Sequence, residues 1–306
     1  MSQQAASLSG NSLRIPLPEP FAVDWALTCL RGSSFGTPFD AVRPDGVRRV
    51  LRLADQLVAV DFTFGRVARE LRVTVVAADP PTGGAATELR RVVSHLWGLD
   101  DDLPACHAAL GEDPWLRPLL QRYAGLRMVR AASLYEALLS AILGQQISVA
   151  SAQSMRRRLM GALGGRLGAQ ADYPAPARLL QAGPEGLLAL GITRQKARYL
   201  LAVAERAADG ALEPARFAGI PDQEAIARLC EIAGVGRWTA EVALMYGLGR
   251  PDVCLAGDLA LQTAVQRLLG RADRPSEREL RGFSERWAGW RSYACLYLLM
   301  TLKPGT

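Results

Sequence analysis

The feature that most constrains the fold is a five-residue turn, I-A-G-V-G, at positions 232–236. Helical segments flank it on both sides, with no room for a long loop between them. Gly234 and Gly236 allow a positive φ and let another group approach the backbone closely. The second helix begins near Arg237, so its free N–H groups point toward the turn. The arrangement is a helix-hairpin-helix that suits a phosphate of any base sequence. An ordinary glycine-capped turn remains the alternative, because G-V-G alone does not separate the two.

The first third of the chain carries strand patterns. In 56–64, Val58, Val60 and Phe62 alternate with polar residues, and 70–76 repeats this alternation. The segment 48–55 indicates a third strand, and a helix capped by Asp24 precedes it. Another helix follows the break P-P-T-G-G at 80–84. These elements predict a small antiparallel sheet with helices on one face.

From about residue 113 onward the patterns are helical. Ser133 with Glu136, Ser148 and Thr193 each precede an apolar helical run and predict three N-caps. A connector rich in glycine and proline covers about 164–177, and the last helix carries Trp287 and Trp290 at helical spacing. The predicted fold is therefore α+β: a disordered tail at 1–12, an α+β domain at 13–112 and a helical core at 113–306.

Charge and cysteine usage narrow the partner and the compartment. The net charge of +6 is compatible with a polyanionic partner. Five cysteines without a C-x-x-C pair argue against a disulfide framework, a zinc site and an iron–sulfur cluster, and favour a reducing cytosol. The sequence has no apolar run long enough for a bilayer and no secretory signal pattern, so we expect a cytoplasmic protein without a membrane partner. Of 36 cationic residues only Lys196 and Lys303 are lysines, so few amines can act as nucleophiles.

Several segments in a fixed order carry a resemblance to a known family. "IAGVGRWTAEVAL" is followed by "GRPDVCLAGDLALQ", and "AILGQQISVASA", "LGITRQKARYL" and "WRSYACLYLL" lie around them. The chain from about 113 to 302 resembles the helix-hairpin-helix DNA glycosylases, and specifically their alkylbase branch. The resemblance implies an active-site cleft between helical subdomains, with double-stranded DNA carrying damaged bases as the substrate. A monomer is the default expectation, because one site on one duplex needs no symmetry.

Asp258 matches the essential aspartate of this family. The residue stands where the helix 258–269 should begin, and an aspartate there is by itself most often an N-cap. The resemblance implies catalysis, because breaking the bond between base and sugar develops positive charge on the sugar. A fixed carboxylate facing that charge lowers the barrier. Asp252, inside the preceding loop, is the weaker candidate.

Trp238 stands where bifunctional relatives carry the lysine that attacks the sugar. Tryptophan cannot form a Schiff base, so the resemblance implies a monofunctional enzyme that leaves an abasic site. An indole attracts a positively charged alkylated purine by cation–π stacking. Trp290 matches the second pocket tryptophan of the branch, although core packing is the usual role of such a residue. Val242 and Leu259 depart from the aromatic residues of a well-known member, which predicts a more open pocket.

Base release requires extrusion of the nucleotide from the stack. The family places a wedge residue in the loop that matches "GQQIS", and Gln146 takes that position. Arg237 is a candidate for phosphate contact, whereas Arg156, Arg157 and Arg158 favour a solvated helix face. No cofactor is expected, except that the family also implies a Na⁺ or K⁺ ion at the hairpin, held by backbone carbonyls of Cys230, Ile232 and Val235.

Two alternatives stay open at this point. A glycosylase for another lesion would share the same motifs, although the missing cluster cysteines and the missing lysine weigh against the mismatched-adenine and oxidised-base types. A non-catalytic DNA-binding module would use the hairpin alone and would tolerate Asp258→Asn.

Overall fold

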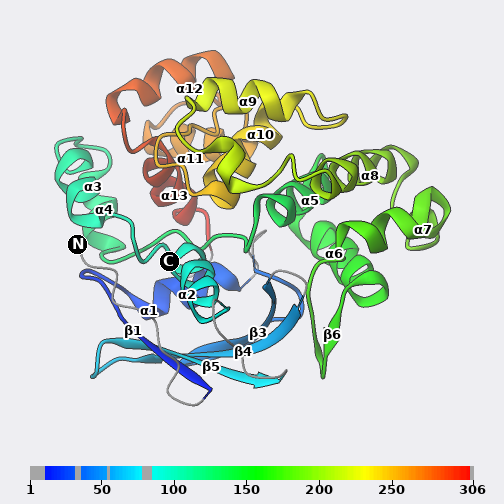
Figure 1. Ribbon diagram of the computed structural model, residues 1–306. Coiled ribbons are helices and arrows are strands. Elements are labelled where there is room, and N and C mark those ends of the chain that lie inside the picture. The colour runs from blue at the N-terminus through cyan, green and yellow to red at the C-terminus, as the bar shows by residue number, and fades with distance from the viewer. Residues whose placement is uncertain (1–10, 32–35, 54–55, 78–84, 304–306) are drawn as a thin grey trace.

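The computed structural model describes residues 11–31, 36–53, 56–77 and 85–303. A five-stranded antiparallel sheet lies at one end, and helices form most of the rest of the molecule (Figure 1). The spatial order is β1-β5-β4-β3-β2. The strands are β1 (Ser12–Pro16), β2 (Ala41–Arg43), β3 (Gly46–Leu53), β4 (Gln56–Gly65) and β5 (Glu70–Ala77). A short hairpin of β6 (Arg166–Leu167) and β7 (Gln170–Ala171) follows α6 (Val149–Leu163) within the segment predicted as a connector. Nowhere in these ranges is a helix long and apolar enough to cross a bilayer.

The alternation predicted for β4 and β5 is confirmed. Val58, Val60 and Phe62 are fully buried, and Val73 lies opposite Phe62 in the adjacent strand. The helices α1 (Val23–Leu30) and α2 (Ala85–Trp97) cover this face of the sheet (Figure 1). The ring of Trp97 at the end of α2 packs edge-on against Phe62 with centroids 5.5 Å apart. The period-2 pattern therefore selects the face that the two helices bury.

Two predictions for the N-terminal region were not confirmed by the structure. Asp24 does not cap α1, because the helix starts one residue earlier with Ala22 as its N-cap. The carboxylate instead lies in the first turn, where the helix dipole favours it, and accepts two hydrogen bonds from Arg66 at 2.6 and 3.0 Å. The tail predicted at 1–12 and the break at 80–84 fall largely outside the described residues, although Ser12 begins β1.

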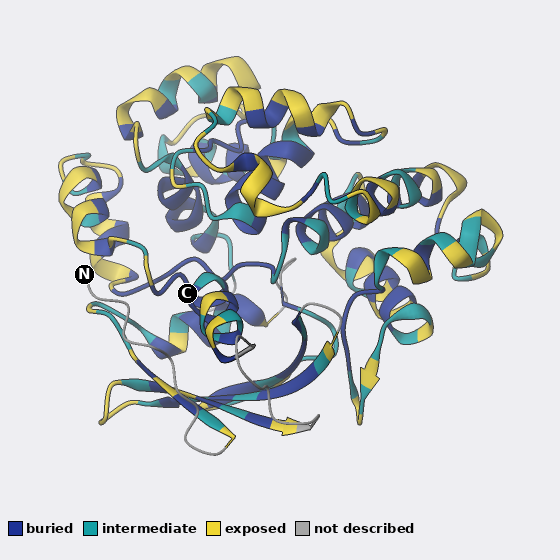
Figure 2. Cartoon of the chain, in the orientation of Figure 1, coloured by how far each residue is buried: buried dark blue, intermediate teal, exposed yellow. Residues whose placement is uncertain are grey.

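Besides α1 and α2, eleven α-helices occur within the described residues, and they form two groups above the sheet (Figure 1). One group contains α5 (Leu134–Gly144), α6 (Val149–Leu163), α7 (Pro176–Ala189) and α8 (Arg194–Ala208). The other contains α3 (Leu103–Leu110), α4 (Arg117–Arg122), α9 (Asp222–Cys230), α10 (Arg237–Ala243), α11 (Leu259–Leu268), α12 (Glu277–Phe283) and α13 (Arg291–Met300). Buried residues line the faces of these helices that point inward, and exposed residues lie on the outer faces of α9 and α12 (Figure 2).

The three predicted N-caps are confirmed. The hydroxyls of Ser133, Ser148 and Thr193 accept N–H groups three residues later, at 3.2, 3.2 and 3.3 Å. In a capping box the Glu136 carboxylate would accept the N–H of Ser133. Here it accepts the N–H of Ala132 instead, so only one of the two capping-box bonds is formed. The caps fix where α5, α6 and α8 begin, and α5 and α8 frame the cleft described below.

The end of the chain differs from its prediction. The last helix begins at Arg291, with Trp290 as its N-cap. Trp287 lies in a separate 3₁₀ turn, Ser284–Trp287, where its ring is buried and its indole N–H donates to Asp113 at 3.0 Å. The two tryptophans have helical spacing but do not lie in one helix, because Gly289 between them has a φ of +88° and interrupts the helical backbone.

Candidate active site

The hairpin between α9 and α10 has the geometry of a backbone anion site. The N–H of Val235 donates to the carbonyl of Ile232 at 3.0 Å and closes the turn. Gly236 is the N-cap of α10, and no side chain caps this helix. Within the described residues, the first backbone N–H groups of α10 therefore remain available to bind an external acceptor.

Gly234 lies directly beneath an aromatic ring. Its φ is +85°, and a Cβ atom added there would lie 2.0 Å from a ring carbon of Tyr199 on α8. The glycine thus allows α8 to pack against the hairpin, and joins the two helical groups at this point.

We expect Gly234→Ala to lower the free energy of unfolding by about 1–3 kcal/mol, because the methyl group meets the Tyr199 ring and the left-handed backbone is strained. Affinity for duplex DNA should fall by about tenfold, because the turn must shift to accommodate the methyl group. A tenfold loss lies within the range of about 1–3 kcal/mol that such overpacking costs. Thermal unfolding and fluorescence anisotropy measure the two quantities. Gly236→Ala is the control for the stability measurement, because its φ is −85° and nothing lies within 4 Å of the added Cβ. A Gly234→Ala protein as stable as the original would contradict this account.

Asp258 and Trp238 are joined by a hydrogen bond. Asp258 is the N-cap of α11, and its Oδ1 accepts the N–H of Leu261 at 3.0 Å. Its Oδ2 accepts the indole N–H of Trp238 at 3.0 Å. Both oxygens are held, so the carboxylate has one orientation, and the indole edge is fixed against it.

A cleft of about 1640 Å³ runs past this pair. Asp258, Trp238 and Gln146 line it. Residues of the hairpin form the adjoining wall, namely Cys230, Ile232, Gly234, Val235, Gly236 and Arg237. The structure therefore brings nine of the ten predicted site residues to one cleft between the helical groups.

Trp290 is the exception. The described lining of the cleft does not include it, and its ring instead packs edge-on against Tyr293 with centroids 6.2 Å apart. Trp290 lies at the start of α13, directly after Gly289, whose φ is +88°. Asp252, the weaker catalytic candidate, is also outside the cleft and pairs with Arg291 at 3.5 Å.

The loop that follows α5 is held in place from two sides. Gln146 is exposed and has a φ of +57°, a conformation that L residues rarely adopt. The amide of Gln145 donates to the carbonyl of Gly234 and to the hydroxyl of Thr239, both at 3.0 Å. Lys196 donates from Nζ to the carbonyls of Leu143 and Gln145 at 2.7 and 2.9 Å, and burial lowers the pKa of this amine. Strain at an exposed tip with such support indicates a functional position.

No motif or periodicity pointed to Tyr246, which lines the inner part of the cleft. It lies in a π-helical turn, Leu244–Leu248, that continues α10. In an uninterrupted α-helix a residue eight positions after Trp238 would be rotated by about 80° from it. The wider π turn reduces the rotation per residue, so Tyr246 returns toward the face of Trp238 and Val242.

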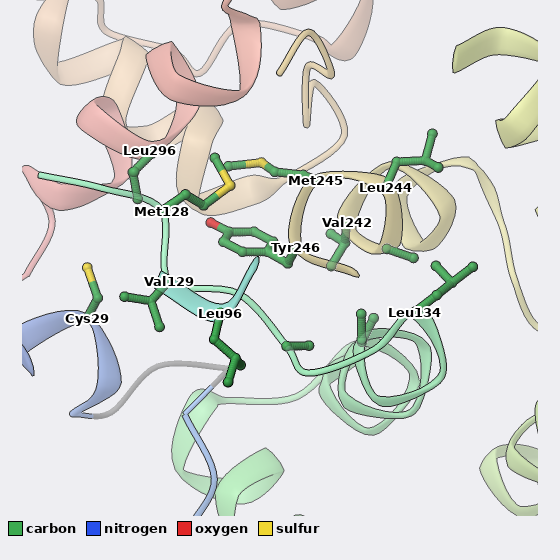
Figure 3. Close-up of a cluster of buried hydrophobic side chains, with 14 of the residues drawn as sticks. Cys29, Leu96, Met128, Val129, Leu134, Val242, Leu244, Met245, Tyr246 and Leu296 are labelled. Atoms are coloured by element: carbon green, nitrogen blue, oxygen red, sulfur yellow. The ribbon is translucent and has the colours of Figure 1, made fainter. Parts of the chain in front are cut away.

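The phenol of Tyr246 is surrounded by apolar side chains, among them Met128, Val129 and Leu296 (Figure 3). Burial raises the pKa of this hydroxyl, so it is protonated at neutral pH. Gly247 allows this turn to pack closely against α5, because a Cβ there would lie 2.9 Å from Leu134 and Ala137. The turn widens where the two helices touch, and this contact could not be read from local sequence.

The cationic residues divide into two kinds. Arg237 is half-exposed beside the hairpin and donates to Glu241 at 2.9 Å. Burial raises the pKa of Glu241, and Arg281, at 3.0 Å, opposes this shift.

The prediction of a solvated arginine run is wrong for Arg156, which is fully buried and donates to the hydroxyl of Ser140 at 3.0 Å. Arg157 and Arg158, on the outer face of α6, are exposed as expected.

The three carbonyls named for a monovalent cation belong to the hairpin that lines the cleft. That of Ile232 already accepts the N–H of Val235, and a carbonyl oxygen has a second lone pair for an ion. An all-carbonyl donor set suits a hard monovalent cation. Over the described ranges, no group of three or more His, Cys, Asp or Glu side chains could hold a metal ion.

Comparison with known proteins gives consistent matches. The model of the HhH-GPD superfamily of base excision DNA repair proteins matches residues 139–289. DNA-3-methyladenine glycosylase 2 of Escherichia coli is 34% identical over 219 residues, which cover 71% of this chain and 72% of that protein. A probable bifunctional transcriptional activator/DNA repair enzyme AlkA of Mycobacterium tuberculosis is 35% identical over 303 residues, 97% of this chain. The chain spans only 58% of that relative's length.

The folds agree as well. The solved structure of a 3-methyladenine DNA glycosylase from Archaeoglobus fulgidus is 27% identical, with a TM-score of 0.78, and the match covers 94% of this chain and 97% of the other. The arrangement of the sheet and of both helical groups is therefore shared with that protein.

Proposed function

Because the chain belongs to the HhH-GPD superfamily of base excision DNA repair proteins, we propose that it is a monofunctional DNA glycosylase releasing alkylated purines from double-stranded DNA. The observation that carries the proposal is the bond between the Trp238 indole and the Asp258 carboxylate inside the cleft. It holds an aromatic ring for the base next to a negative charge for the sugar. The names of the relatives, which refer to 3-methyladenine, support the same substrate class.

The chemistry follows from the charges of the reacting groups. An alkylated purine carries a positive charge, which an indole face attracts by about 0.5–2 kcal/mol. As the bond to the sugar breaks, the positive charge moves to the sugar, and Asp258 stabilises it there. The products are a free base and an abasic site, after water adds to the sugar. Oδ1 and Oδ2 each accept one N–H, and their remaining lone pairs can orient that water.

The absence of a suitable amine supports monofunctional action. Trp238 occupies the position of the attacking lysine in bifunctional relatives. Lys196 has its Nζ directed at two backbone carbonyls, and Lys303 donates to the carbonyl of Thr28 at 3.2 Å. Both amines are thus held by backbone carbonyls, and of the two only Lys303 is part of the described cleft wall.

DNA would be held at two places. The hairpin glycines and Arg237 would grip a phosphate downstream of the lesion, and Gln146 would fill the gap left by the extruded nucleotide. A Na⁺ or K⁺ ion on the carbonyls of Cys230, Ile232 and Val235 would add positive charge at this grip. The enzyme would act as a cytoplasmic monomer, because one cleft serves one lesion.

The test uses purified protein and duplex DNA treated with a methylating agent. Released bases are identified by chromatography, and the DNA is run on a denaturing gel before and after alkali. We expect methylated purines in the supernatant and strand breaks only after alkali. Breaks without alkali would contradict monofunctional action, and DNA binding without any released base would contradict the alkylbase assignment.

A further inference from the structure

A second carboxylate lines the cleft near Asp258. Glu277, the first residue of α12, belongs to the cleft wall although it lies outside every motif described above. Its side chain is 52% exposed. The carboxylate is therefore open to the solvent of the cleft and faces whatever enters it.

The carboxylate of Glu277 lies close to Gly257, the residue that precedes Asp258. A methyl group added at Gly257 would lie 3.4 Å from Oε2 of Glu277 and 3.7 Å from Cβ of Trp238. Glu277 therefore lies on the part of the cleft wall that also carries Trp238 and Asp258.

An ion-pair network orients Glu277. Its Oε1 accepts from Arg281 at 2.7 Å, and no donor to Oε2 occurs in the part of the chain that the structure describes. Arg281 also pairs with Glu241, which Arg237 contacts as well. The charged residues that line the cleft are the anionic Glu231, Asp258 and Glu277 and the cationic Arg237 and Lys303, so one negative charge is in excess.

A negative charge here has a cost, because the cleft must admit a polyanion. Glu277 repels phosphates of any sequence, and the repulsion is offset only when the extruded base is positively charged. This is the arrangement expected of a filter that rejects neutral bases, since rejection by an unfavourable charge is a common route to specificity.

We propose that Glu277 is a specificity-determining residue that favours positively charged alkylated purines over neutral damaged bases. The proposal rests on the function proposed above and identifies the charge state of its substrates. Asp258 stabilises the sugar, whereas Glu277 discriminates between bases.

The experiment measures affinity, so that it does not depend on catalysis. Glu277→Gln is made in an Asp258→Asn protein, which leaves the base attached. Dissociation constants are measured by anisotropy for three matched duplexes that are undamaged, contain one hypoxanthine as a neutral base, or contain one 7-methylguanine as a cationic base. We expect Glu277→Gln to tighten binding of the first two, and to lower the preference for the cationic duplex over them by about two- to fivefold, as for a partly exposed charge pair.

Glu224→Gln is the matched control. Glu224 lies in the first turn of α9, pairs with Arg228 four residues later at 2.6 Å and is 48% exposed, but it does not line the cleft. It should leave the preference unchanged. An equal change for all three duplexes in Glu277→Gln would overturn the proposal, because it would indicate a purely structural or general electrostatic role. Release of methylated bases by the unmodified protein tests the proposed function separately.

Discussion

Replacement of Asp258 by Asn is expected to slow the release of methylated purines by about 10²–10³-fold, the loss typical when one preorganised electrostatic group is removed from an active site. The fold should persist, because Asn caps a helix as well as Asp and can accept the N–H of Leu261. The substitution removes the negative charge and also the bond from the Trp238 indole, because the NH₂ group that replaces Oδ2 cannot accept its N–H. Single-turnover release from a defined duplex measures the rate, and thermal unfolding measures the stability.

Asp252→Asn is the control for this result. Asp252 precedes Asp258 in the same loop and is also half-buried, but it pairs with Arg291 outside the cleft. Its replacement should leave the rate within about twofold, as for a surface ion pair. If Asp258→Asn keeps full activity, the aspartate is only an N-cap and the catalytic assignment fails.

Replacement of Trp238 by Phe is expected to slow release by about 10–100-fold, the equivalent of one hydrogen bond to a charged group. Phe keeps an aromatic face for the base but cannot donate to Oδ2 of Asp258, so the carboxylate loses one of its two fixed contacts. Affinity for damaged DNA should fall less than the rate. The comparison of dissociation constant with single-turnover rate therefore separates orientation of the carboxylate from stacking.

The protein contains its own control for this change. Trp287 donates from its indole to Asp113 at 3.0 Å, the same kind of bond at the same length, but it is buried outside the cleft. Trp287→Phe should lower the thermal stability and leave the rate per folded molecule unchanged. Equal rates for Trp238→Phe and the unmodified protein would show that the hydrogen bond has no part in the reaction.

Local sequence patterns were sufficient for much of the fold. The alternation in β4 and β5 and the caps at Ser133, Ser148 and Thr193 depend on residues adjacent in the chain. The prediction that Asp24 is an N-cap was wrong because an aspartate suits both the N-cap and the first turn of a helix. Local sequence does not distinguish these two positions. The buried position of Arg156 depends on Ser140, sixteen residues away on another helix.

The candidate site shows the same division. The hairpin glycines and Asp258 could be found from motifs, whereas the bond between Trp238 and Asp258 joins residues that are twenty positions apart. Tyr246 lines the cleft from a π-helical turn whose Gly247 packs closely against α5, whereas Trp290 follows the left-handed Gly289 and does not line the cleft. Such positions depend on tertiary contacts, which periodicity does not encode.

The amide of Gln145 has a consequence for how such a protein would search DNA. It bonds the loop that carries Gln146 to the carbonyl of Gly234 in the hairpin. Gln146 and the hairpin turn are thus held at a constant distance from each other. If the hairpin binds a phosphate, as proposed, Gln146 always contacts the nucleotide at the same distance from that phosphate. The protein would then move along DNA by one sugar–phosphate repeat at a time, and its position would be set by the backbone rather than by the bases.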